Sequence, residues 1–142
     1  MNVSPFFDTN VLIYAFREED PRNQTARMLL GEGGVIGVQV LNEFVAIAKR
    51  KLGFGWEEVL QALAAIRVLC PSVVPLTLET HERALQIAQR YGYHVFDALV
   101  IAAAIEAGSS MLYTEDMQDG QRIETVTLRN PFSSQARHKP RR

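Results

Sequence analysis

The stretch Phe6-Phe7-Asp8-Thr9-Asn10-Val11-Leu12-Ile13-Tyr14 shows how the chain is built. Its first two residues end a short apolar segment that starts at Val3 and is typical of a strand. Three polar residues follow, and the apolar run after them favours a helix that extends to about Phe16. The sequence therefore predicts that a strand passes directly into a helix, with Asp8 at the carboxyl end of the strand.

The same alternation continues along the chain. We expect further strands at residues 35–38, 73–76, 111–114 and 124–128. We expect further helices at residues 21–30, 39–52, 56–69, 79–91 and 96–107, with Asp20 as the N-cap of the first and Pro21 at its first helical position. Strands separated by helices predict an α/β protein, a three-layer α/β/α fold with a mostly parallel sheet of four to five strands.

Length and charge indicate one domain with a basic tail. A chain of 142 residues suits a single domain, which we place at residues 1–132. Residues 133–142 contain four basic side chains and no acidic one, and we expect this tail to be disordered. Because the formal net charge is −1, residues 1–132 carry −5. An acidic domain argues against simple electrostatic binding of nucleic acid but permits binding that recruits cations.

The sequence also predicts a soluble cytoplasmic protein. The one cysteine is Cys70, so no disulfide can form within the chain. The N-terminus has no basic stretch of the kind found in signal peptides. The longest apolar run without a charge, residues 98–105, is too short to cross a bilayer, and we expect no membrane partner.

Four acidic residues lie against apolar segments. Asp8 and Asp116 follow predicted strands, at the edge where parallel sheets bind ligands. Glu43 and Asp97 lie in predicted helices between apolar neighbours. Two carboxylates about 4 Å apart repel each other by roughly 4 kcal/mol at an effective dielectric constant of about 20, so a cluster of them favours a bound cation. Mg²⁺ and Mn²⁺ suit such oxygen ligands and can activate water for phosphodiester hydrolysis.

Each of these acids also has a structural interpretation. Asp8 and Asp97 could each cap a helix. Glu43 could be a solvated helix residue, and Asp116 could belong to a turn. The metal interpretation therefore rests on the set of four. His94, three residues before Asp97, could contact a substrate, although a structural role is more common for a histidine with no other ligand near it in sequence.

Four segments of the chain resemble, in order, the motifs of PIN domains, and particularly those of VapC-type toxins. The first is the stretch quoted above, and the others are Val40-Leu41-Asn42-Glu43-Phe44, Phe96-Asp97-Ala98-Leu99-Val100-Ile101-Ala102-Ala103-Ala104 and Leu112-Tyr113-Thr114-Glu115-Asp116-Met117. The resemblance covers Phe6 to Asp116, which is most of the chain, and implies a mostly parallel sheet between helices. Four motifs in the family's order are far more specific than one.

The resemblance also implies an activity and a set of site residues. It implies Mg²⁺- or Mn²⁺-dependent endonucleolytic cleavage of RNA. Carried over by position, Asp8, Asp97 and Asp116 would be metal ligands. Glu43 would bind the metal directly or through water and would orient the attacking water. The residues that would support the site are Asn10, Thr114 and, as an auxiliary acid, Asp119.

The resemblance also implies partners, and the residues themselves allow two other functions to be weighed against it. Resemblance to VapC-type toxins implies a homodimer and a cognate antitoxin that inserts a segment into the acidic pocket, often with an arginine. A phosphatase that forms an aspartyl-phosphate also has an aspartate after its first strand, but it would want a second acid where this chain has Asn10. A non-catalytic PIN-like binding module is disfavoured because all four key acids are present.

Overall fold

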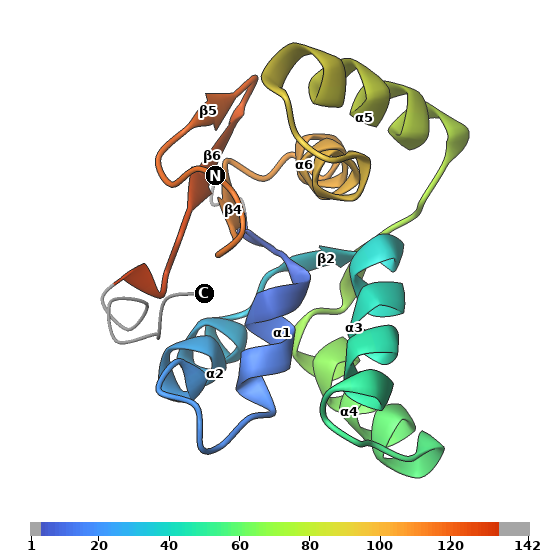
Figure 1. Ribbon diagram of the computed structural model, residues 1–142, viewed down its shortest axis with the longest axis vertical. Coiled ribbons are helices and arrows are strands. Elements are labelled where there is room, and N and C mark those ends of the chain that lie inside the picture. Colours follow the sequence, from blue (N-terminus) through green and yellow to red (C-terminus); the bar gives the residue numbers. More distant parts are fainter. Residues whose placement is uncertain (1–3, 134–142) are drawn as a thin grey trace.

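The computed structural model describes residues 4–133, in which strands and helices alternate (Figure 1). The strands are β1 (Phe6–Phe7), β2 (Val35–Gly37), β3 (Ser72–Val74), β4 (Met111–Tyr113), β5 (Arg122–Ile123) and β6 (Val126–Arg129). The helices are α1 (Thr9–Ala15), α2 (Asn23–Glu32), α3 (Val38–Arg50), α4 (Trp56–Leu69), α5 (Leu78–Tyr91) and α6 (Val95–Glu106). Nearly all of the basic tail predicted at 133–142 lies outside the described residues.

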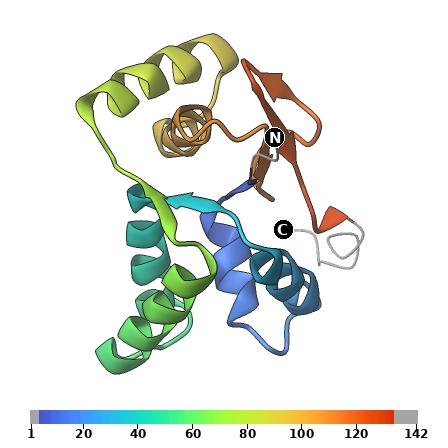
Figure 2. The same cartoon turned by 180° about the vertical axis from the view of Figure 1, so that it is seen from behind.

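The strands form one sheet in the order β3-β2-β1-β4-β6-β5. All neighbouring strands pair in parallel except β5 and β6. Figures 1 and 2 show α1 to α4 on one side of the sheet and α5 and α6 on the other. The predicted three-layer α/β/α fold with a mostly parallel sheet is therefore confirmed.

The sheet contains one strand more than the sequence predicted. Arg122 and Ile123 form β5, which pairs with β6 as a hairpin. The strand predicted at 124–128 starts only at Val126, because Glu124 and the next residue form the turn, with Glu124 in the left-handed region at φ 52°. Hairpin turns of this kind favour Asn and Gly, and their absence here removes the usual sequence signal.

The start of α2 also differs from the prediction. Asp20 does not cap this helix, which begins at Asn23. Instead the Asp20 carboxylate accepts hydrogen bonds from the backbone N–H and the guanidinium of Arg22, each at 2.8 Å. An aspartate that binds the backbone two residues ahead stabilises a turn, and this turn delays the helix.

The strands in the middle of the sheet contribute fully enclosed side chains to the core. Phe6, Ile36, Leu112 and Leu128 are all inaccessible to solvent. The helix α6 is buried over most of its circumference, with every side chain from 98 to 104 inside, since it packs between the sheet and α5. Within residues 4–133, no helix has the length and apolar character needed to cross a membrane.

Candidate functional site

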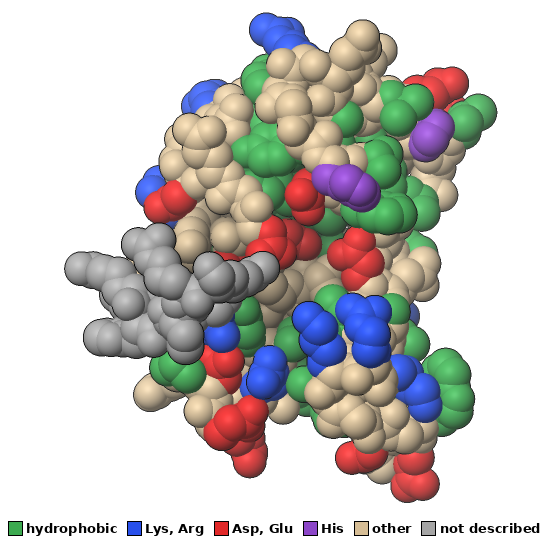
Figure 3. Space-filling model, viewed as in Figure 1, with side chains coloured by type: hydrophobic (Ala, Val, Ile, Leu, Met, Phe, Trp, Pro, Cys, Tyr) green, Lys and Arg blue, Asp and Glu red, His purple; other side chains and the backbone are tan. Residues whose placement is uncertain are grey.

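All four acids singled out in the sequence line one pocket of about 370 Å³. Asp8 follows β1, Asp116 lies in the loop after β4, Glu43 lies in α3, and Asp97 lies in the first turn of α6. The pairing of β1 with β4 brings the first two together, since both strands end at the same edge of the sheet. We call this the carboxylate pocket, and Figure 3 shows acidic side chains gathered in the middle of this face.

Asp8 is the most enclosed of the four, with 4% of its surface exposed. Its Oδ1 accepts a hydrogen bond from the backbone N–H of Thr9, and its Oδ2 accepts one from the hydroxyl of Thr114, both at 2.7 Å. The pKa of Asp8 is raised to about 7, chiefly by burial; the nearby charges of Asp116 and Glu43 add to this rise, and the two hydrogen bonds oppose it. Asp8 therefore caps α1, and its burial among other acids also favours the binding of a proton or a cation to its carboxyl group.

Glu43 is fixed by two donors. The Thr9 hydroxyl donates to Oε1 and the Gln39 side-chain amide donates to Oε2, each at 2.8 Å. The sequence predicted neither of these two contacts with Glu43. Gln39 lies four residues before Glu43 in α3, so helical spacing could have identified that contact. The contact of Thr9 links distant parts of the chain and has no comparable signal.

Asn10 and Thr114 hold the loop that carries Asp116. The Asn10 amide donates to Oδ2 of Asp116 at 3.2 Å, and its Oδ1 accepts the backbone N–H of Glu115 at 3.3 Å. The Thr114 hydroxyl accepts the backbone N–H of Asp116 at 3.2 Å while it donates to Asp8. These two residues, predicted to support the site, therefore lie between its acids.

Asp97 faces the same group of charges from α6. Its pKa is raised, first by burial and then by the charges of Asp116 and Glu43, whereas His94 lowers it. Asp97 is half-buried, and it is the acidic residue of the first turn of its helix. The structural alternative, a helix cap, does not apply because His94 occupies the N-cap position.

Asp119, predicted as an auxiliary acid, is not among the residues that line the carboxylate pocket. Its Oδ1 accepts the backbone N–H of Asn130 at 2.9 Å. This hydrogen bond joins the loop after β4 to the chain just beyond β6. The structure thus gives Asp119 a role in holding a loop.

Glu115 also lines the pocket, where its carboxylate forms an ion pair. Its carboxylate accepts the guanidinium of Arg22 at 2.9 Å and the hydroxyl of Tyr14 at 2.5 Å. Arg22 also stacks on the Tyr14 ring, 3.8 Å from the ring centroid. Both members of this ion pair are nearly buried, and neither was predicted, because they lie 93 residues apart in the sequence.

The donor set of the pocket fits a hard divalent cation. Carboxylate oxygens suit Mg²⁺ and Mn²⁺, and the pocket lining contains no histidine or cysteine that would favour a softer metal. Among residues 4–133, no group of three Asp, Glu, His or Cys side chains has an arrangement that could hold a metal ion without rearrangement. Hydrogen bonds from neighbouring side chains and the backbone engage oxygens of Asp8, Glu43 and Asp116 instead. Magnesium commonly needs only one or two carboxylates with water, so the donor set remains suitable.

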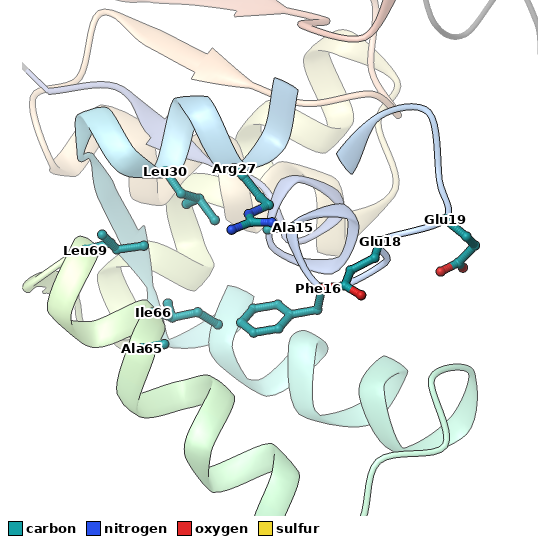
Figure 4. Close-up of a pocket in the computed structure, with 9 residues that line it drawn as sticks. All are labelled: Ala15, Phe16, Glu18, Glu19, Arg27, Leu30, Ala65, Ile66 and Leu69. Carbon is teal, nitrogen blue, oxygen red and sulfur yellow. The ribbon is translucent and has the colours of Figure 1, made fainter. Parts of the chain in front are cut away.

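A second cavity of about 550 Å³ lies between α1, α2 and α4 (Figure 4). We call it the helix pocket. Its walls include Phe16, Leu30, Ile66 and Leu69, and it shares no lining residue with the carboxylate pocket. It is larger, and its charged lining residues are Glu18, Glu19 and Arg27 in place of a cluster of four acids.

Residues 6–119 match the model of the PIN domain, so the chain belongs to this family. Its structure is similar to that of VapC20 from Mycobacterium tuberculosis, described as a toxin that cleaves the sarcin–ricin loop, with 26% identity, a TM-score of 0.66, and coverage of 80% of this chain and 90% of that one. No curated protein matches the sequence.

Two complexes show the same fold at lower identity. A toxin–antitoxin complex from Klebsiella pneumoniae has 20% identity and a TM-score of 0.68, covering 90% of this chain and 98% of that one. DNA-bound VapBC from Salmonella typhimurium has 17% identity and a TM-score of 0.66, covering 92% of this chain and 99% of that one.

Proposed function

We propose that this protein is a Mg²⁺- or Mn²⁺-dependent endoribonuclease and the toxin of a toxin–antitoxin pair. The observation that carries the proposal is the convergence of Asp8, Glu43, Asp97 and Asp116 on one pocket, with the pKa of two of them raised. Membership of the PIN family and similarity to VapC20 support it.

In this proposal Asp8, Asp97 and Asp116 hold the cation, with Glu43 as a further ligand, directly or through water. When bound, the cation would lower the pKa of water and stabilise the negative charge that develops on the phosphate. Glu43 orients the attacking water, and the hydrogen bonds from Thr9 and Gln39 keep its carboxylate in place for this task.

Basic residues at the edge of the pocket suit an anionic substrate. Arg17 and Lys51 line the carboxylate pocket beside the acids. Figure 3 shows basic side chains directly below the acidic group on this face. They would bind the phosphates on either side of the cleaved bond, while the cation offsets the acidic charge at the bond itself.

The structure adds a reason against the aspartyl-phosphate alternative. Asn10, at the position where that mechanism wants an acid, donates to Asp116.

We further propose that the toxin acts in the cytoplasm as a homodimer and is inhibited by a cognate antitoxin. The complexes from Klebsiella pneumoniae and Salmonella typhimurium supply the precedent for such a partner. An arginine from the antitoxin would pair well with the carboxylates of the pocket.

Metal titration of the purified protein tests the proposed activity. Mn²⁺ at a hundredfold excess over its dissociation constant should stabilise the fold by about 2.7 kcal/mol, seen as a higher melting temperature. RNA cleavage should require Mg²⁺ or Mn²⁺ and stop when EDTA is added. Cleavage that persists in EDTA, or a melting temperature that neither metal changes, would contradict the proposal, and the latter would favour a non-catalytic module.

A further inference from the structure

An exposed aromatic pair lies next to the carboxylate pocket. Phe96 is 53% exposed, and His94 is exposed as well. Their ring centroids are 5.3 Å apart, with the ring planes at 37°. His94 is the N-cap of α6, and Phe96 and Asp97 both lie in the first turn of this helix, so the pair lies at the end of α6 that carries Asp97. Figure 3 shows a histidine beside the acidic side chains, with hydrophobic side chains against it.

Hydrogen bonds hold this aromatic pair in place. The backbone N–H of Phe96 donates to Nδ1 of His94 at 3.2 Å, which fixes the orientation of the histidine ring. The neighbouring Tyr93 hydroxyl accepts the backbone N–H of Gln118 at 3.2 Å and donates to Gln121 at 2.5 Å. The segment that carries the pair is thus joined to the loop that follows Asp116.

The pair does not serve the core. An exposed phenylalanine loses the stabilisation that burial would give it. Trp56 is also a large exposed aromatic residue, but the ammonium of Lys49 lies over its ring, 4.7 Å from the centroid. The ring of Phe96 has no such cation: among the aromatic and cation–π contacts of residues 4–133, it contacts only the ring of His94.

We propose that His94 and Phe96 form a stacking platform for a nucleobase of the RNA strand, next to the phosphate that is cleaved. This inference rests on the proposed ribonuclease function and specifies how that site holds its substrate. Unpaired RNA bases are commonly bound by stacking on aromatic side chains, and a preorganised pair of rings offers such a surface. The basic residues Arg17 and Lys51 would bind phosphates, and the aromatic pair would bind a base.

The platform makes a specific prediction about affinity. Phe96→Ala should weaken binding of a short single-stranded RNA by about fivefold to 150-fold, since base stacking on one aromatic residue is worth about 1–3 kcal/mol. Phe96→Tyr should retain the affinity. Leu78→Ala is the matched control, because Leu78 is also an exposed apolar side chain, at 68%, but lies in α5, which carries none of the four acids.

A fluorescent base gives a readout that a structural role would not affect. RNA that carries 2-aminopurine near its cleaved bond should lose fluorescence on binding to the wild-type protein and to Phe96→Tyr, but much less on binding to Phe96→Ala. If that base is replaced by an abasic nucleotide, wild type and Phe96→Ala should bind equally well.

The possible failures are distinguishable. If the wild type binds and cleaves RNA with Mg²⁺ or Mn²⁺ but Phe96→Ala binds as tightly, the platform is overturned and the ribonuclease stands. If the wild type neither binds nor cleaves RNA, both proposals fail. If Phe96→Ala converts a dimer to a monomer in analytical ultracentrifugation, the surface belongs to a second copy of the chain, which also overturns the platform.

Discussion

The carboxylate pocket and the helix pocket differ in how they are formed. The first lies where β1 and β4 end, and side-chain and backbone donors hold its acids at fixed positions. The second lies between the side chains of three helices and is the larger of the two. The comparison teaches that the volume of a cavity does not identify the chemistry. The polar groups that converge at the ends of strands do.

The two pockets also differ in their electrostatic energy. In the carboxylate pocket, burial and then neighbouring carboxylates hold the pKa of Asp8 and Asp97 above their ordinary values, so it is unfavourable to ionise both groups when no cation is bound. The helix pocket has Glu18 and Glu19 in its lining, and both side chains are exposed to solvent. Strongly perturbed carboxyl groups are typical of functional sites, because the fold tolerates them for the sake of activity.

The largest effect should come from removing one charge in the carboxylate pocket. Asp8→Asn should reduce the rate of RNA cleavage by about three orders of magnitude, comparable with the loss of one preorganised electrostatic group. The same chemical change in the helix pocket, Glu18→Gln, should leave the rate within about twofold, well below that loss. Single-turnover kinetics with Mg²⁺ would measure both. Equal rates for the two variants would contradict the distinction between the pockets.

A substitution in the helix pocket should have a somewhat smaller effect, and this effect should be on the stability of the fold and not on its activity. Ile66 lines this pocket and is 1% exposed. Ile66→Ala should reduce the free energy of unfolding by about 3 kcal/mol, since it removes buried methyl groups. Urea unfolding would measure the loss, and the folded fraction should cleave RNA at the wild-type rate. A stable variant with reduced cleavage would show that the helix pocket contributes to activity.

The smallest effect concerns the pH dependence of stability. Burial raises the pKa of Asp8 to about 7 in the folded protein, above the ordinary value of 3.8. The folded protein keeps this proton where the unfolded chain loses it, so the group reduces stability as the pH rises between these values, and its penalty is complete above them. The shift corresponds to at most about 4 kcal/mol.

Asp8→Asn removes that penalty but replaces one acceptor oxygen with an amide nitrogen, which offsets part of the gain. Without metal, the variant should therefore be more stable than wild type by about 2 kcal/mol near pH 8, with a smaller difference near pH 5. Urea unfolding at the two pH values in EDTA would measure this. A variant less stable than wild type near pH 8 would mean that the hydrogen bonds of Asp8 outweigh its desolvation.

Parts of this structure were predictable because they depend on residues close in sequence. The alternation of strands and helices follows from local apolar periodicity, and the motif stretch around Asp8 placed its acid at the end of a strand. The hairpin at Glu124 was missed because its turn lacks the usual Asn or Gly. The late start of α2 at Asn23 was missed because Asp20 accepts the backbone N–H of Arg22 and so stabilises a turn before the helix.

The sequence by itself determined the α/β class, the order of the motifs and which four acids line the carboxylate pocket. Only the tertiary structure decided which donors hold those acids, that Arg22 pairs with Glu115, that Asp119 binds a loop, and that Phe96 lies exposed beside Asp97. The physical reason is that periodicity is a local property of the chain. A hydrogen bond or ion pair between residues far apart depends on the order of strands in the sheet, which brings their side chains within reach.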